Sequence, residues 1–366
     1  MPRKYLKTII AFSLPLQVIL VQVIATQPKL VEKWYSGTFY KQISQFLRTL
    51  FGNTTVPIGQ LLFYSIIILC LIWLIRQFRA VITKKVNFKL FLKNILLGTF
   101  LFLATFYFLF MLTWGFNYHR QPVSSTVGIE EKRITPTKLV ALCQVLVNLT
   151  NTSRNQLTPN NHHALSLPIT HSEIITRATW GYQKMAQKYP ALAYSHPAVK
   201  SVYVPELMSF FGVGGIYFPF TGEANVNMDP PDFLLPATVC HEMAHQIGIA
   251  SEDEANYVAY LACRLNPDPS FEYSGNLMAM KYAMNRLHRV DSVAYQQLEQ
   301  QFSPGLKLDL EKSRNYWNSF NNPIAQFSDV FYDLFLKAND QTEGIESYSR
   351  MVELIMGEYK KNKLLY

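Results

Sequence analysis

Two histidines and a glutamate occur at helical spacing near the middle of the chain. His241, Glu242 and His245 form the pattern H-E-x-x-H. Residues four apart lie on one face of an α-helix, so the two imidazoles can present nitrogens to one metal ion. Glu242 lies one step round the helix, close enough to accept a proton from a metal-bound water. This spacing predicts a metal site with Glu242 as the catalytic residue.

The residues on either side predict the helix that positions these three side chains. Pro236 suits the first helical turn and Gly248 suits a helix end, and no Gly or Pro lies between them. The apolar composition of this helix predicts that it is buried, which suits a metal site walled off from bulk water. Its apolar residues are Ala237, Val239, Met243, Ala244 and Ile247.

The expected metal is zinc, Zn²⁺. Two histidines, one carboxylate and an open position form a common catalytic zinc site, whereas closed structural sites contain more cysteine. Zinc would lower the pKa of a bound water towards about 7, and Glu242 would take the proton as that water attacks an amide carbonyl. The pattern therefore favours hydrolysis.

Two carboxylates compete for the third ligand position. If the chain turns at Gly248–Ala250, Glu254 lies roughly level with the middle of the helix that carries His241 and His245. Ser251 and Glu254 also match the capping box S-x-x-E, which is a sufficient structural reason for a glutamate there. Glu252 has no such capping role. On spacing alone, both glutamates remain candidates.

The composition indicates a membrane protein. Of the 366 residues, 16% are charged, which is below the about 25% of typical soluble domains. Apolar stretches occur at about 8–25, 58–75 and 94–114. The first could instead be a signal peptide ending near Ala25, but its apolar run is long for one, which favours a retained helix. We therefore expect a membrane anchor with three transmembrane helices over residues 1–117.

The distribution of basic residues predicts the orientation in the membrane. Between the second and third spans lie six basic residues and no acidic one: Arg76, Arg79, Lys84, Lys85, Lys89 and Lys93. Such a loop is typical of the cytoplasmic side. The chain from about residue 118 then lies outside the cytoplasm, and the protein is a multi-pass protein of the cell (inner or plasma) membrane. Much of the net charge of +9 sits beside the spans, so it does not indicate nucleic-acid binding.

Residues 118–366 are expected to form one extracytoplasmic catalytic domain, mostly helical with a small β-sheet, which gives an α+β fold. The sheet is predicted from β-rich runs at 202–204, 216–218 and 224–227. Helices are expected over the longer stretches: about 135–149, 170–188, 275–290, 292–302, 309–320, 327–338 and 345–362, with a polar loop at 150–167 and a break at Pro304-Gly305.

Two further segments have predicted roles. The aromatic stretch 27–57 suits a short amphipathic helix at the membrane interface. The strand that precedes the metal-site helix is expected to bind a peptide along its edge. This makes Gly215, Tyr217 and Asn225 candidate substrate-binding residues.

The H-E-x-x-H pattern with a glutamate shortly after it resembles the zincin superfamily of metallopeptidases. The sequence E-x-x-A-N that begins at Glu252 is similar to the second motif of the gluzincins. That resemblance implies that Glu252 is the third ligand and that Asn256 orients a ligand histidine. The gap after His245 is shorter than in thermolysin-like enzymes. Ser251 occupies the metzincin ligand position, so that pattern is not met either, and the resemblance favours Glu252 over Glu254.

Most of the chain also resembles one bacterial membrane-protein family, which is catalogued as a domain of unknown function and presumed to consist of metallopeptidases. The resemblance rests on the three spans and on the runs Gly215–Asn225, His241–Ala262 and Gly344–Tyr348. It implies the same architecture, and it brings no established substrate.

These observations favour a membrane-anchored zinc metalloendopeptidase. Its expected partners are a peptide or protein substrate and the lipid bilayer, with no nucleic acid, and the sequence does not indicate an oligomeric state. One alternative is a zinc-dependent amidase that acts on cell-wall or other non-protein amides. Another is a non-catalytic zinc-binding membrane scaffold, against which Glu242 argues because a structural site has no use for a proton acceptor.

The basic loop makes the orientation testable with reporter fusions. A reporter fused after residue 366 should be active only outside the cytoplasm, and one fused near Lys84 only inside, because lysine and arginine are retained on the cytoplasmic side. The activities of an externally active and a cytoplasmically active reporter at each site measure this. A cytoplasmic C-terminus would contradict the predicted localisation.

Overall fold

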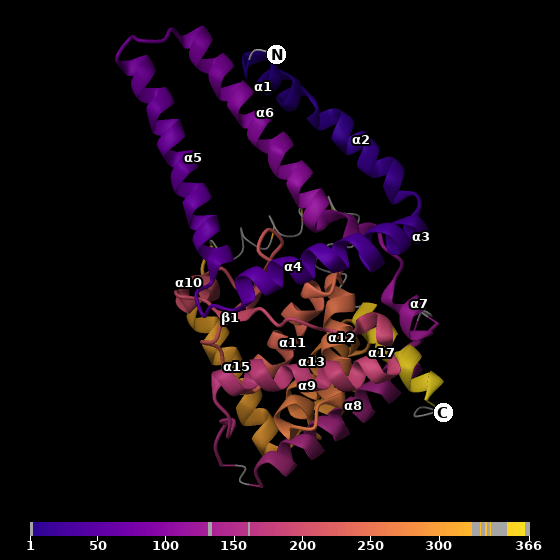
Figure 1. Ribbon diagram of the computed structural model, residues 1–366. Helices are drawn as coiled ribbons and strands as arrows, with labels where there is room; N and C mark the ends of the chain where they lie inside the picture. The colour runs from indigo at the N-terminus through magenta and orange to yellow at the C-terminus, as the bar shows by residue number, and fades with distance from the viewer. Residues whose placement is uncertain are drawn as a thin grey trace.

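The computed structural model describes residues 3–130, 134–159, 162–323, 330, 334, 337 and 350–362. Long helices extend from one side of a helical body, and the N-terminus lies at their far end (Figure 1). The run Gly344–Tyr348 and most of the helix expected at 327–338 lie outside the described residues.

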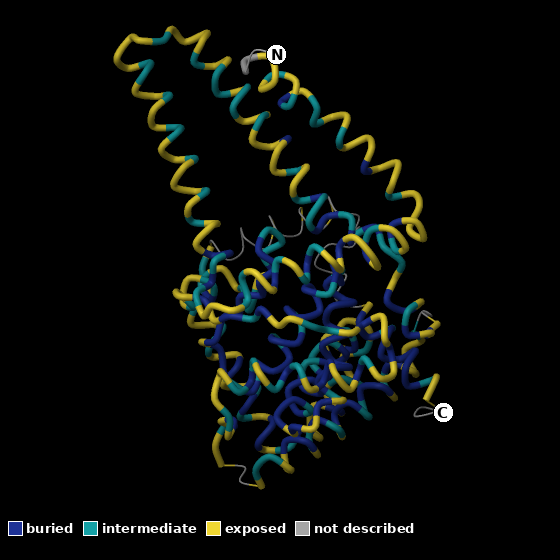
Figure 2. The backbone as a smooth tube through the Cα atoms, in the orientation of Figure 1, coloured by how far each residue is buried: buried dark blue, intermediate teal, exposed yellow. Residues whose placement is uncertain are grey.

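Three helical spans near the N-terminus are long and apolar enough to cross a membrane. They run over Tyr5–Ala25, Ile58–Ile82 and Phe88–Thr113 and contain 21, 25 and 26 residues, whereas about 20 residues cross a hydrocarbon core. The first consists of α1 (Arg3–Phe12) and α2 (Leu14–Ala25), and the others are α5 and α6. Their apolar side chains are largely exposed (Figure 2). The prediction of three apolar helices is confirmed.

α5 and α6 are longer than the apolar stretches at 58–75 and 94–114. The basic residues beside those stretches continue both helices, since lysine and arginine have high helix propensity. Asn87 sets the start of α6, because its Oδ1 accepts a hydrogen bond from the Leu90 N–H at 2.9 Å.

The stretch between the first two spans folds back over the body. It consists of three successive segments: α3 (Pro28–Leu30), the π-helical η1 (Val31–Phe39) and α4 (Tyr40–Gly52). α4 lies across the base of the spans (Figure 1). It buries Tyr40, Ser44 and Arg48, which recur at every fourth position and therefore share one face. The expected amphipathic helix is present, and one of its faces packs on the body.

The body is built around α11 and α12, whose residues are mostly buried (Figure 2). Every residue of α12 from Glu252 to Cys263 is buried. Between the spans and α11 lie η2 (Gly115–His119), α7 (Val123–Val127), α8 (Pro136–Leu157), α9 (His171–Lys188), η3 (Pro190–Leu192), α10 (Pro205–Phe210) and η4 (Asp232–Leu234). The site helices and those after them are α11 (Leu235–Gln246), α12 (Glu252–Leu265), α13 (Pro269–Val290), α14 (Ser292–Glu299), α15 (Pro304–Ser319) and α17 (Arg350–Lys361).

A three-stranded sheet lies between α11 and the spans. Its strands are β1 (Val199–Ser201), β2 (Gly215–Phe218) and β3 (Glu223–Val226), in the order β1-β3-β2. β3 runs parallel to β1 and antiparallel to β2. β2 is therefore an edge strand, and it contacts α11. The mostly helical fold with a small sheet agrees with the prediction.

α8 is longer than predicted and replaces part of the expected loop at 150–167. Thr150 Oγ1 donates to the Leu146 carbonyl at 2.7 Å, so this polar residue is compatible with a helix interior. Arg154 is wholly buried and forms an ion pair with Asp309, with Nε and Oδ2 2.5 Å apart. The helix ends at Leu157 because Thr158 precedes Pro159, which disfavours a helical backbone at Thr158. The buried pair holds its last turn against α15.

The first strand precedes the run predicted at 202–204. Val202 makes one more ladder bond, from its N–H to the Val226 carbonyl at 3.1 Å. The N–H of Tyr203 then donates to Oε1 of Gln60 in α5 at 3.0 Å, and Pro205 opens α10. The strand ends where Tyr203 contacts Gln60 of α5. The β-rich run at 202–204 contains no signal for that contact.

Pro304 and Gly305, expected to separate two helices, instead form the first turn of α15. Ser303 is the N-cap, and its Oγ accepts from the Leu306 N–H at 3.3 Å. A proline suits this position because the first-turn N–H has no partner within the helix.

The N-terminus of α5 is held by a buried charge pair of the sheet. Glu223 of β3 is wholly buried, Lys200 of β1 is 4% exposed, and their side chains form an ion pair. Glu223 also accepts from the backbone N–H groups of Ile58 and Gly59, where a carboxylate is stabilised by the helix dipole. Lys200 donates to the Phe51 carbonyl in the last turn of α4 and to the Val56 carbonyl just before α5. The sheet and the second span are therefore one unit.

Substitution of Glu223 should test this unit. Glu223→Leu leaves the Lys200 ammonium buried without its counter-charge, and removing one partner of a buried pair costs about 3–5 kcal/mol. We expect a clear fall in the midpoint of thermal unfolding of the detergent-solubilised protein. Glu206→Gln, at an exposed position of α10, is the matched control.

The double variant Lys200→Met/Glu223→Leu should recover part of the lost stability, because neither buried charge remains. An unchanged unfolding midpoint in the single variant would show that the pair does not hold α5.

Candidate metal site

A tight reversal of the chain brings the candidate ligands together. α11 ends at Gln246, and Gly248 adopts a left-handed conformation with φ +87°. A Cβ at Gly248 would lie 2.8 Å from the Tyr40 ring, so both the conformation and the close contact require glycine. α12 begins four residues later at Glu252. The reversal places the start of α12 beside the last two turns of α11.

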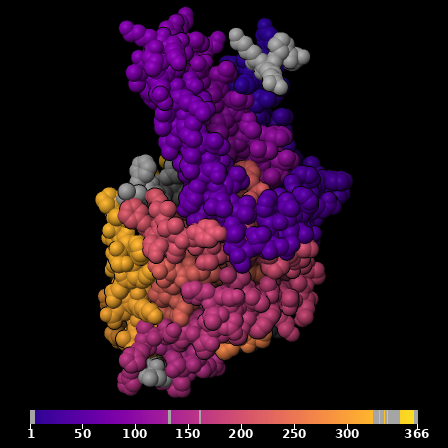
Figure 3. Space-filling model, turned by 60° about the vertical axis from the view of Figure 1, so that its left-hand side comes forward, coloured from indigo at the N-terminus to yellow at the C-terminus, as the bar shows by residue number. Residues whose placement is uncertain are grey.

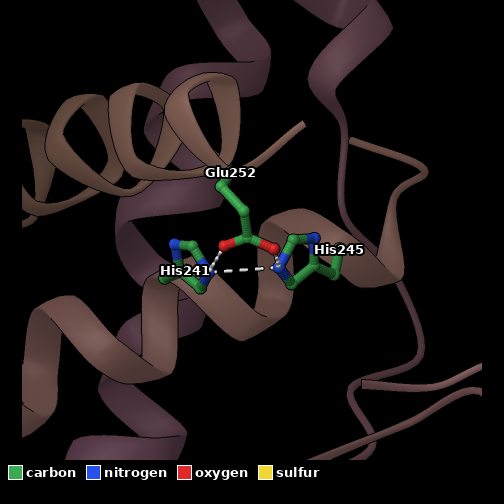
Figure 4. Close-up of side chains that lie close together, drawn as sticks. All are labelled: His241, His245 and Glu252. Carbon is green, nitrogen blue, oxygen red and sulfur yellow. Dashed lines mark hydrogen bonds and ion pairs between the residues drawn. The ribbon is translucent and has the colours of Figure 1, made fainter. Parts of the chain in front are cut away.

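His241, His245 and Glu252 converge on one point (Figure 4). The two Nε2 atoms are 3.1 Å apart. The Glu252 carboxylate lies between them, with Oε2 3.2 Å from His241 Nε2 and Oε1 3.5 Å from His245 Nε2. Glu252 was favoured over Glu254 as the partner of the histidines, and the structure places it there.

Both imidazoles are oriented by hydrogen bonds through their other nitrogen. Nδ1 of His241 lies 2.9 Å from Oδ1 of Asn256, and Nδ1 of His245 lies 2.7 Å from the Ile249 carbonyl. Both partners are acceptors, so each Nδ1 carries the proton and each Nε2 presents a lone pair. Asn256 thus has the geometry that the gluzincin resemblance implied.

The three side chains fit a zinc ion. Zinc bonds of about 2.0–2.1 Å at tetrahedral angles place neighbouring ligand atoms about 3.3–3.4 Å apart. The two Nε2 atoms, 3.1 Å apart, are close to this spacing. One carboxylate oxygen of Glu252 lies 3.2 Å from His241 Nε2 and the other lies 3.5 Å from His245 Nε2. Two lone pairs and a carboxylate in a buried place repel each other unless a cation lies between them. The donor set of two imidazoles and one carboxylate is one that catalytic zinc sites use.

Burial and charge act in opposite directions on the histidines. Burial lowers the pKa of His241, but the hydrogen bond and negative charge of Glu252 outweigh it and raise that pKa above its ordinary value. For His245, burial prevails over the Glu252 charge and lowers the pKa to about 4. A positive charge on His241 is thus favoured beside Glu252, whereas one on His245 is disfavoured.

Glu242 lies beside the three candidate ligands and is 4% exposed. Its Oε2 has no hydrogen-bond partner in the part of the chain that the structure describes. Burial raises its pKa to about 8, and the Glu252 charge adds to this effect against the opposing His241. A buried carboxyl with an unpaired oxygen is an unusual feature, because such groups are normally satisfied.

Gly215 of β2 makes room for the Glu242 carboxylate. A Cβ at this position would lie 2.4 Å from Glu242 Oε1. A side chain there would displace the Glu242 carboxylate, so glycine allows the edge strand to pass directly over it. This gives Gly215 a steric role that its place in a β-rich run did not reveal.

Gly215 and Tyr217 direct their backbone groups to the open side of β2. In an antiparallel ladder, hydrogen-bonded pairs alternate with non-hydrogen-bonded pairs. The Asn227 N–H donates to the Gly214 carbonyl at 2.9 Å, so the register of β2 on β3 leaves the N–H and C=O of Gly215 and Tyr217 pointing away from β3. These two candidates lie on an edge.

Asn225 does not lie on an edge. It belongs to the central strand β3, where Lys200 pairs with it on one side and Ile216 on the other. Its side chain is wholly buried, and neither polar atom has a partner within the described ranges. The substrate-pairing role therefore has no geometric basis at Asn225.

Aromatic residues from the membrane-anchored part form one wall of the site. The ring of Trp114, the residue after α6, lies 5.9 Å from that of His245 and 4.7 Å from that of Tyr217. The negative charge of Glu252, together with the larger effect of burial, raises the pKa of Tyr118 and of Tyr282. Trp114 and Tyr118 follow an apolar span, where aromatic residues are common interface anchors. Their sequence position therefore gave no indication that they lie at the site.

The free carbonyls at the end of α11 accept hydrogen bonds from the same part of the chain. Tyr40 OH donates to the His245 and Gln246 carbonyls at 3.2 Å, and Ser44 Oγ donates to the latter at 2.9 Å. Arg120 Nη1 donates to the Gly248 carbonyl at 2.9 Å. The last carbonyls of a helix lack partners within it, so these side chains stabilise the end that carries His245.

Glu254 points away from the histidines. It is buried, and Oε1 accepts from the Val123 N–H at 2.7 Å. Burial raises its pKa to about 8, with a further contribution from the charge of Asp253. The predicted capping box is wrong, because the Ser251 hydroxyl bonds to Asp253 and makes no side-chain cap. The contact with Val123 is the structural reason for a glutamate at this position.

The two glutamates should therefore respond differently to substitution. Loss of a residue that only orients a ligand weakens metal binding by about 10–100-fold. Glu252→Ala removes a ligand itself, so it should weaken zinc binding by more than this. Glu254→Ala should keep the affinity and lower stability by about 1–3 kcal/mol, because the buried Val123 N–H loses its acceptor. Competition with a chelating dye measures affinity, and thermal unfolding measures stability. Zinc lost only in Glu254→Ala would reverse the assignment.

A comparison with known families gives one match. Residues 35–356 match the family described as "Protein of unknown function (DUF3810)". No curated protein and no solved structure shows significant similarity to the chain. The matched region begins in η1 and includes α4, two of the spans, the sheet and both site helices. This agrees with the resemblance to a domain of unknown function, and the chain belongs to the DUF3810 family.

Proposed function

We propose that this protein is a membrane-anchored zinc metalloendopeptidase that hydrolyses peptide bonds outside the cytoplasm. The observation that carries the proposal is the convergence of His241, His245 and Glu252 beside the unpaired carboxyl oxygen of Glu242. The three-ligand set leaves a coordination position open, and the fourth residue is a proton acceptor. Catalytic zinc sites need both features.

Each residue has a distinct role in this proposal. Zinc, when bound by the two Nε2 atoms and Glu252, supplies a Lewis acid for the amide carbonyl and lowers the pKa of a coordinated water. Glu242 accepts the proton of the attacking water and passes it to the leaving amine. Its raised pKa of about 8 suits a group that must both gain and lose a proton near neutral pH. Asn256 keeps His241 in the metal-binding tautomer.

The edge strand supports a peptide substrate. The outward N–H and C=O groups of Gly215 and Tyr217 can form a ladder with an extended chain. Because Gly215 lies against Glu242, a chain paired with β2 would pass the proton acceptor. An antiparallel edge strand that passes over the H-E-x-x-H helix in this way supports a zincin-like catalytic body.

The alternatives explain fewer of these features. A cell-wall amidase has no need of an edge strand beside its proton acceptor, and here the wall of the site is aromatic. A non-catalytic scaffold leaves the unpaired, buried oxygen of Glu242 without a purpose. The basic loop between α5 and α6 supports a body outside the cytoplasm.

Two variants test the proton acceptor. Glu242→Gln should retain zinc and lose about 10²–10⁴-fold in hydrolysis of a mixed peptide library, because the ligands are intact and the general base is gone. Gly215→Ala should also retain zinc and lose activity, since its Cβ displaces the Glu242 carboxylate. Bound metal and cleavage are measured on the same full-length samples.

Gly212→Ala provides the matched control, because a Cβ there meets no neighbouring atom, although its φ of +73° costs some stability. Full activity in Glu242→Gln would remove the proposed mechanism.

A further inference from the structure

We infer that the substrate is a polypeptide anchored in the same membrane and cut close to the bilayer surface, an inference that rests on the proposed function. It follows from where β2 begins and where it leads. One end of this strand lies at Glu242, and the other lies between two membrane spans.

The first end is set by Gly215. Its position is so close to Glu242 that a Cβ would lie 2.4–2.6 Å from the Oε1, Cδ and Cγ atoms of that residue. Tyr217, two residues on, shares the same face and packs on Trp114, whose ring also meets His245. A chain paired along this strand is therefore next to the reacting groups at Gly215.

The second end is set by the turn after β2. The ring of Phe218 lies 6.5 Å from that of Phe63 in α5, and the ring of Phe220 lies 5.5 Å from that of Phe106 in α6. Phe63 is five residues into its helix and Phe106 is seven before the end of its helix. At about 1.5 Å per residue, Phe63 and Phe106 lie about 7–10 Å along their helices from the ends nearest the body. The turn between β2 and β3 thus reaches the membrane-spanning part of the protein.

The length of this path sets the expected spacing. β2 runs from Gly215 to Phe218, and at about 3.3 Å per residue its three steps measure about 10 Å. The turn that follows bonds back to the Phe218 carbonyl through the N–H groups of Thr221 and Gly222. A substrate strand paired with β2 has the same rise per residue. Its scissile bond would then lie about three residues from the point where the strand meets the spans, a distance that a spacer of about five residues covers.

The other walls agree with a site close to the bilayer. Trp114 directly follows the last residue of α6, Thr113, and contacts His245. Tyr40 of α4, which lies across the base of the spans, donates to the carbonyls at the end of α11. In the space-filling view, the spans stand directly on the body, with α4 and its neighbours covering the side of the body beside them (Figure 3). Residues adjacent to the spans thus contact the site.

The inference is tested with the full-length, zinc-loaded protein in phosphatidylcholine proteoliposomes. The substrates carry a mixed-sequence segment at about 5, about 15 and about 30 residues from a single membrane-spanning helix, and a second series carries the same segments on a palmitoyl chain. The same segments without an anchor form a third arm. Cleavage is followed by mass spectrometry, which also locates the cut, and bound zinc is measured in each sample.

We expect the shortest spacer to be cut at least about 10-fold faster than the longest one and than the free segment, because the effective concentration is highest when the tether matches the distance. The anchor series that is cut identifies whether a helix or a lipid supplies the tether. Equal cleavage of free and anchored segments would overturn the inference and leave the peptidase intact. Cleavage of the long spacers alone would also overturn the inference, because it would show that a short spacer does not reach from the bilayer to the site.

Failure of the proposed function has a different signature. If no arm is cut in a zinc-loaded sample and Glu242→Gln behaves identically, the peptidase proposal is lost and this inference with it. If free segments are cut and anchored ones are not, only the substrate class is wrong.

Discussion

The reversal of the chain at Gly248 is the constraint on which the site depends. It must be tight enough to place Glu252 between two imidazoles on the preceding helix, and this requires the left-handed backbone that glycine adopts most readily. The space beside Gly248 is filled by Tyr40, which also binds the carbonyls at the end of α11. The same residue thus closes the turn and stabilises the helix end. A side chain at position 248 would disturb both.

The position of Tyr40 shows that the segment between the first two apolar spans is part of the candidate metal site's framework. A boundary between anchor and body near residue 117 follows the end of the last span, yet Tyr40, Ser44 and Trp114 lie on the anchor side and contact α11 or its histidine. Glu223 extends this dependence to the sheet, because it binds the first amides of α5. The body and the spans form one packed unit, in which the sheet is fixed to the membrane part.

Local patterns predicted much of this structure. The H-E-x-x-H spacing, Pro236 and Gly248 predicted α11 and its end, and the helix expected over about 170–188 corresponds to α9. Contacts between distant segments were not predictable, because no short pattern records them. Glu254 matched a capping box and instead binds Val123, which is far away in the sequence. Asn225 matched an exposed strand and instead occupies the centre of the sheet.

The capping of α5 by Glu223 has a consequence for the order in which the protein forms. The first amides of this helix receive their acceptor from a residue 165 positions later in the chain. The ribosome therefore completes both α5 and α6, and a further hundred or so residues, before the partner exists. During synthesis, other acceptors such as water must bind those amides until Glu223 has been made. The start of α5 therefore gains its final partner only after both long helices are complete and the sheet has formed beside it.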